Sequence, residues 1–220
     1  KQYLNNTRVR IIRNDNNIGT YCSKNYGIQL SKGKYVCFAD SDDYVTKDWL
    51  KIEYDAFQDN PNLVAVKGNY VRVDGNGNIL LNRGIEQRPS YISTMLKKDE
   101  VINRIGYFDS VRFNGDMEYD ERLKLVFGKD RIKEINKLFI YQLKRDDSLT
   151  GASATYSDID TNSIEIGNNL AHLSPVRLEY VNNFRKWHKE IKERGDSPYL
   201  PYPLNKRKFN APELMINKDN

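Results

Sequence analysis

The sequence has 220 residues, enough for one domain with a sizeable hydrophobic core. Its 35 Lys and Arg against 30 Asp and Glu give a formal net charge of +5, which suits an anionic ligand. Because the two signs are interspersed and no nucleic-acid-binding motif accompanies them, we expect no nucleic-acid partner. No apolar run approaches a membrane span, and two cysteines are too few for a disulfide framework, so we expect a reduced, cytoplasmic chain.

The first expected unit is a strand, a helix and a second strand. The β-branched run at 9–12 predicts a strand, residues 19–30 predict a helix that Gly33 closes, and residues 35–39 predict a buried strand. Short connections between such elements predict a βαβ unit with parallel strands. The sequence is therefore expected to form an α/β fold.

Three aspartates follow the expected strand at 35–39 directly. In extended backbone alternate side chains point the same way, so Asp40 and Asp42 can direct their carboxylates at one point, with Asp43 beside them. Such carboxylates repel unless a cation lies between them, and hard oxygen ligands suit Mg²⁺ or Mn²⁺. The alternative is that Asp42, Asp43 or Thr46 caps the next helix and the acidic turn is merely solvated.

The rest of the chain predicts further helices and strands around loops. We expect helices at 48–57, 98–105 and 116–127, a β-rich segment at 63–73 that turns at 74–78 into 79–81, and strands at 91–95, 131–135 and 138–144. From residue 157 the pattern is helical, with Pro175 dividing two helices and Gly195 ending the second. The proline-rich last twenty residues are expected to lie extended on the surface.

A second candidate site lies at Asp116 and Glu118. On the sequence pattern alone, the position of Asp116 at the start of a helix favours an N-cap or a partner for the helix dipole.

Several of these stretches follow one another in a familiar order: N-I-G at 17–19, S-K-N-Y-G at 23–27, S-K-G-K-Y-V at 31–36 and D-S-D-D at 40–43. Together they resemble the family-2 glycosyltransferases of the GT-A fold, over about residues 8–150. The resemblance implies a mixed central sheet flanked by helices, with a catalytic domain over 1–151. Beyond it, the residue pattern predicts C-terminal helices and an extended tail over 152–220, packed on that domain. The family's opening strand, helix and strand have no counterpart here, so the domain is expected to be N-terminally incomplete.

The resemblance also implies roles for particular residues. Asp40, Asp42 and Asp43 would hold Mn²⁺ or Mg²⁺, and Asp116, in the G-D pair at 115–116, would be the catalytic base, with Glu118 as the fallback. The sugar nucleotide would be bound by Lys24, Asn25, Asp40, Ser41 and Arg145. On the residues alone Lys24 equally fits a solvated helix position, Asn25 the ordering of a nearby loop, and the loop at 145–150 an exposed acidic turn.

The function implied is metal-dependent, inverting transfer of a sugar from a nucleoside diphosphate to a hydroxyl of a glycan. UDP is the nucleotide most common in the family. The Q-x-x-R-W motif of processive synthases is absent, so single addition is expected. One alternative is a truncated or degenerate, non-catalytic module that binds a glycan or a partner. A nucleic-acid or membrane-surface protein is a second, supported by charge alone.

Near the C-terminus, apolar residues recur at helical spacing. We expect this stripe to dock on its own domain, although a basic amphipathic helix could instead make peripheral contact with the inner face of a membrane. The stripe consists of Val176, Tyr180, Phe184, Trp187 and Ile191.

Overall fold

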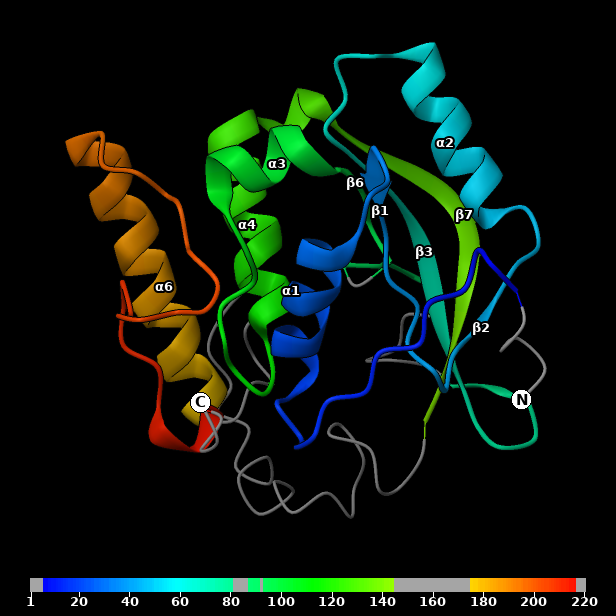
Figure 1. The fold of residues 1–220 in the computed structure, drawn as a ribbon, viewed down its shortest axis with the longest axis horizontal. Helices are drawn as coiled ribbons and strands as arrows, with labels where there is room; N and C mark the ends of the chain where they lie inside the picture. Colours follow the sequence, from blue (N-terminus) through cyan, green and yellow to red (C-terminus); the bar gives the residue numbers. More distant parts are fainter. Residues whose placement is uncertain (1–5, 81–86, 92, 145–174, 217–220) are drawn as a thin grey trace.

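The protein is a mixed sheet with helices on both faces, described by a computed structural model over residues 6–80, 87–91, 93–144 and 175–216 (Figure 1). The helices are α1 Thr20–Leu30, α2 Trp49–Asp59, α3 Lys98–Ile105, α4 Gly115–Phe127 and α6 Pro175–Arg194, with the 3₁₀ turns η1 Lys129–Arg131 and η2 Glu213–Met215. The strands are β1 Tyr35–Val36, β2 Tyr44–Val45, β3 Ala65–Val73, β4 Ile79–Leu80, β5 Arg88–Pro89, β6 Met95–Lys97 and β7 Ile132–Leu143.

The sheet has the order β1-β6-β3-β7-β2, and β4 and β5 also pair with β3. The long strands β3 and β7 are parallel, with Ala65 opposite Ile132, whereas β1, β4, β5 and β6 make antiparallel pairs. The predicted mixed sheet is confirmed, and so is the hairpin at 74–78, which leads into β4.

Alternation along the strands divides the core between the two faces of the sheet. Ala65 and Leu96 point toward α1, α3, α4 and α6, which together form the larger apolar cluster. Their neighbours Val66 and Met95 point the other way and pack with Ala56 and Phe57 of α2. Figure 1 shows α2 on one side of the sheet and the other helices on the opposite side.

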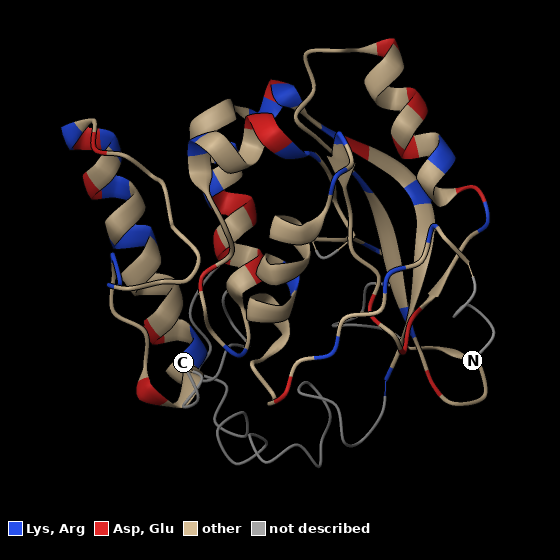
Figure 2. Ribbon diagram, in the orientation of Figure 1, with Lys and Arg blue, Asp and Glu red and all other residues tan. Residues whose placement is uncertain are grey.

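The apolar stripe of α6 faces the domain. Tyr180, Phe184, Trp187 and Ile191 are buried in the larger cluster, and the ring of Trp187 stacks on Phe209 of the tail at 5.1 Å between centroids. The prediction that this stripe docks on its own domain is confirmed, so it is not available to a membrane. Residues of both charge signs occur along α6 (Figure 2). Within the described ranges, no helix has the length and apolarity that crossing a membrane would need.

The C-terminal tail is part of the same core. Leu200, Phe209 and Met215 are buried in the larger cluster, so the tail is not confined to the surface as expected. Leu200 makes a parallel bridge with Gly106, where its carbonyl accepts the Tyr107 N–H at 2.9 Å. The boundary predicted at 151/152 lies outside the described residues.

The strand predicted at 9–12 is wrong. These residues form no strand, and Val9, Ile11 and Ile12 are 40%, 67% and 47% exposed. A β-branched run becomes a strand only where another backbone pairs with it, and β1 instead pairs antiparallel with β6. The predicted βαβ unit is therefore not formed.

Four other strand predictions had the wrong bounds. The strand expected at 35–39 is only β1, and the strand expected at 91–95 begins at Met95. The segments at 131–135 and 138–144 form one continuous strand, β7, because both pair with β3.

Candidate functional site

The acidic cluster lies in a turn between β1 and β2. The Asp43 N–H donates to the Asp40 carbonyl at 3.2 Å, which closes the turn, and Ser41 is exposed. Burial, and then the charges of Asp40 and Asp42, raise the pKa of Asp43 to about 6. The charges of Asp40 and Asp42 therefore act on the Asp43 carboxyl within this turn.

Capping does not explain this cluster. The helix α2 begins at Trp49, and the residue before it is Asp48, so neither Asp42 nor Asp43 occupies the N-cap. Among the described residues, no group of three or more His, Cys, Asp or Glu is arranged to enclose a metal ion. A hard cation that takes one or two carboxylates and completes its shell with phosphate oxygens and water still fits these oxygen donors.

Lys24 extends from α1 to the acidic turn. Its Nζ lies 2.9 Å from Asp40 Oδ1, and its side chain is only 10% exposed. The ammonium is also 5.7 Å from the centroid of the Phe38 ring. Lys24 is therefore not a solvated helix residue, and it places a positive charge beside the aspartates.

Asn25, the next residue of α1, has a structural role in the described fold. Its buried amide donates to the Phe108 carbonyl and accepts the Phe108 N–H, both at 2.9 Å. Because both ends of the amide are used, Asn25 orders the loop before α4 and does not face a sugar nucleotide. This outcome supports the alternative expected for Asn25 over direct donor binding.

Asp116 lies in the first turn of α4 and is half-buried. Its Oδ1 accepts a hydrogen bond from the Tyr21 hydroxyl of α1 at 2.7 Å. A small cavity beside it is lined by Phe38, Tyr91, Thr94, Leu96, Phe108, Asp116, Tyr119, Asp120 and Leu123. Asp116 therefore borders a hollow that also reaches the segment leading to the acidic turn.

Helix α1 joins the two predicted constellations. Tyr21 bonds Asp116 and, one turn later, Lys24 pairs with Asp40. The charge of Asp40 also contributes to the raised pKa of Tyr21, after burial and Asp116. The acidic turn and the proposed base thus lie against one face of one helix.

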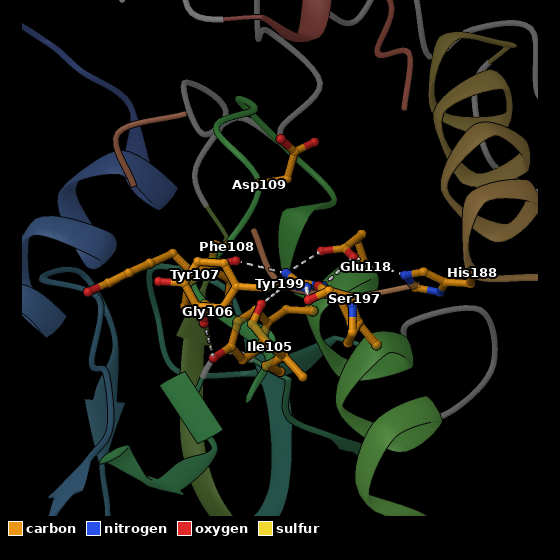
Figure 3. A network of polar contacts seen from close by, with 12 residues as sticks. Ile105, Gly106, Tyr107, Phe108, Asp109, Glu118, His188, Ser197 and Tyr199 are labelled. Carbon is orange, nitrogen blue, oxygen red and sulfur yellow. Dashed lines mark hydrogen bonds and ion pairs between the residues drawn. The ribbon is translucent and has the colours of Figure 1, made fainter. Parts of the chain in front are cut away.

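Glu118 points away from this site. Its carboxylate is fully buried and accepts hydrogen bonds from the Arg122 guanidinium at 2.8 and 2.9 Å, while His188 Nε2 of α6 lies 3.0 Å away (Figure 3). Burial opposes its charge, but the charge of Arg122 and the contact with His188 outweigh it and lower the pKa of Glu118. A carboxylate enclosed in this way is unsuited to take a proton from a substrate. Of the two predicted bases, the geometry favours Asp116.

Arg145 and the loop at 145–150 lie outside the described residues.

Sequence reasoning missed Tyr21 and the aromatic cluster below it. Phe108 stacks on Tyr119 at 4.2 Å and meets Tyr21 and Phe38, each at 5.7 Å between centroids. The sequence could have indicated Tyr21 through its spacing from Lys24, because residues three apart share a helix face.

Comparison with known proteins identifies the family. The family described as Glycosyl transferase family 2 matches residues 1–120, more than half of the 220-residue chain. The chain therefore belongs to glycosyltransferase family 2. This membership and the mixed sheet flanked by helices confirm the predicted GT-A-type α/β fold.

Curated relatives match over a shorter stretch. Glycosyltransferase GlyG of Streptococcus pneumoniae is 34% identical over 71 residues, which cover 32% of this chain and 23% of that protein. Uncharacterized glycosyltransferase MJ1057 of Methanocaldococcus jannaschii is 29% identical over 73 residues, covering 33% and 25%. The matched stretches thus span about a quarter of these relatives.

Among solved structures, S. aureus TarS 1-349 in complex with UDP-GlcNAc superimposes with a TM-score of 0.48 and 19% sequence identity. The superposition covers 70% of this chain and 47% of TarS 1-349.

Proposed function

We propose that this domain transfers a sugar from a nucleoside diphosphate sugar, with UDP as the nucleotide, to a hydroxyl of a glycan acceptor. The observation that supports the proposal is the arrangement along α1, where Tyr21 contacts Asp116 and Lys24 contacts Asp40. Transfer needs a cationic, carboxylate-rich place for the diphosphate and a base beside it. The acidic turn with Lys24, and the candidate base Asp116, both contact helix α1.

In the proposed reaction Asp116 accepts the proton of the acceptor hydroxyl as its oxygen attacks the anomeric carbon. The bond from that carbon to the diphosphate oxygen breaks, and the electron pair leaves with the diphosphate. Because attack and departure occur on opposite faces, one displacement inverts the anomeric configuration. The glycan is released after each addition, so the enzyme is non-processive; the absence of the Q-x-x-R-W motif from the sequence supports this.

A divalent cation, Mn²⁺ or Mg²⁺, held by one or two of the carboxylates of Asp40, Asp42 and Asp43 would supply positive charge to the diphosphate leaving group. Lys24 adds a fixed charge of the same sign next to Asp40. The ammonium does not offer the bidentate contact of an Arg, so the cation would carry more of the diphosphate binding.

Thermal melting with UDP tests the binding half of this proposal. UDP with MnCl₂ is expected to raise the melting temperature, and neither is expected to do so to the same extent alone. Asp42→Asn should lose this effect, while Asp99→Asn, an exposed aspartate of α3, serves as the matched control. Protection by UDP that needs no metal and survives Asp42→Asn would overturn the proposed donor site.

Release of UDP from a panel of UDP-sugars tests the catalytic half. Asp116→Asn should keep the manganese-dependent protection by UDP and lose turnover. Manganese-dependent protection without turnover of any UDP-sugar, with or without added glycan acceptors, would instead support the non-catalytic module.

A further inference from the structure

The hydroxyl of Tyr21 holds one oxygen of Asp116 across a long sequence separation. Tyr21 is in the first turn of α1 and Asp116 in the first turn of α4, and the O–H donates to Oδ1 at 2.7 Å. Tyr21 is only 5% exposed, whereas Asp116 is half-buried and borders the cavity. One side of the carboxylate is therefore fixed by a buried group.

The ring of Tyr21 has little freedom to move. A Cβ placed on Gly115 would come within 2.9–3.1 Å of three ring carbons, so the ring lies directly against the backbone of the residue before Asp116. Phe108 stacks on the ring at an interplanar angle of 28°. Glycine at 115 is thus what allows the phenol to reach the carboxylate.

The phenol is a hydrogen-bond donor under ordinary conditions. Burial, followed by the charge of Asp116, holds the pKa of Tyr21 well above its ordinary value. The proton therefore stays on Tyr21, and Asp116 receives a hydrogen bond in place of a competing negative charge.

We propose that Tyr21 is a positioning residue for the proposed base: it binds Oδ1 of Asp116 and so directs the second carboxylate oxygen toward the acceptor hydroxyl. This inference rests on the proposed function. A carboxylate can rotate about its terminal bond, and a base must meet the proton it removes within hydrogen-bonding distance. Fixing one oxygen removes that rotation before the acceptor arrives.

Tyr21→Phe tests the role because it keeps the ring against Gly115 and Phe108 and removes only the hydroxyl. We expect kcat for UDP release, measured with the UDP-sugar that turns over fastest, to fall by about 10- to 100-fold. The KM for that UDP-sugar should stay unchanged, and so should the rise in melting temperature that UDP with MnCl₂ causes. Tyr26→Phe, at an exposed tyrosine of the same helix, is the matched control and should behave like the wild type.

A double variant distinguishes positioning from a general structural effect. If Tyr21 acts through Asp116, Tyr21→Phe should add nothing to the loss caused by Asp116→Asn. Losses that multiply, or a rise in KM without a fall in kcat, would overturn the inference. Should Asp116→Asn keep full turnover, the proposed base fails. If only Tyr21→Phe keeps full turnover, the inference about Tyr21 fails alone.

Discussion

Arg122 and Glu118 form an ion pair in which both side chains are fully buried. The Arg122 guanidinium also donates to the carbonyls of Ile105 and Tyr107, and His188 of α6 approaches Glu118 from the other side (Figure 3). The ion pair thus connects α4 with the end of α3 and the following loop through Arg122, and with α6 through Glu118.

Arg122→Ala is expected to destabilise the protein by about 3–5 kcal/mol, because it leaves the Glu118 carboxylate buried without its main partner. The control is Arg185→Ala, which breaks a partly exposed pair with Glu121 and should cost about 1 kcal/mol or less. Urea denaturation measures both. Equal losses would contradict a special role for the buried pair.

The buried carboxyl of Glu53 should make stability fall as the pH rises. Within the described part of the chain neither of its oxygens makes a hydrogen bond of normal geometry, and burial raises its pKa to about 9 against a smaller opposing contribution from the Trp49 side chain. The folded protein therefore binds this proton more tightly than an unfolded chain, where Glu titrates near about 4.3. The contribution to stability is complete below about pH 4 and is lost as the pH rises toward 9.

Glu53→Gln removes this titration. Its free energy of unfolding, measured with urea, should fall less than that of the wild type between about pH 5 and about pH 9. Glu179→Gln, at an exposed position of α6, should keep the wild-type pH dependence. Parallel curves for the wild type and Glu53→Gln would show that Glu53 is charged in the folded state.

Gly106→Ala is expected to destabilise the protein more than Gly77→Ala. Gly106 has φ 74°, and a Cβ there would overlap the backbone of Leu200. Gly77 has φ 85° but open space around it, so Gly77→Ala reports the cost of the conformation alone, about 1 kcal/mol or slightly more. Thermal melting compares the two variants. An equal fall in melting temperature would mean that the backbone at Leu200 moves aside at little cost in stability.

Asn25→Ala should reduce stability and leave donor binding intact. The buried Phe108 N–H and carbonyl would lose their partners, at a cost of about 1–3 kcal/mol. Asn14→Ala, which removes an exposed bond to Ser23, is the control. Loss of the UDP effect without loss of stability would make Asn25 a donor ligand after all.

Much of the local structure was readable from the sequence. Helix α3 begins and ends where predicted, because Gly106 supplies the backbone conformation that stops it. The hairpin after β3 was predicted from its Asp-Gly and Asn-Gly steps, and Asp74 indeed accepts hydrogen bonds from the N–H groups of Asn76 and Asn78.

What the sequence could not supply was long-range pairing. The residue types at 9–12 favour a strand as those of β3 do. Yet the run at 9–12 pairs with no strand of the described sheet, whereas β3 is paired on both sides. The contact of Tyr21 with Asp116 joins residues 95 positions apart. The bridge between Gly106 and Leu200 fixes the C-terminal tail to the domain, although the prolines of the tail had led us to expect it on the surface. The family pattern pointed to Asp116 but not to the residue that holds it.

Helix α1 acts as a spacer of fixed length. A helix advances by about 1.5 Å and turns by about 100° for each residue. Tyr21 and Lys24 are three residues apart, so they reach Asp116 and Asp40 from the same side. Inserting two residues between them would turn one of the two side chains to the opposite side of the helix, because residues five apart do not share a face. This short stretch of helix can therefore vary in composition far more easily than in length.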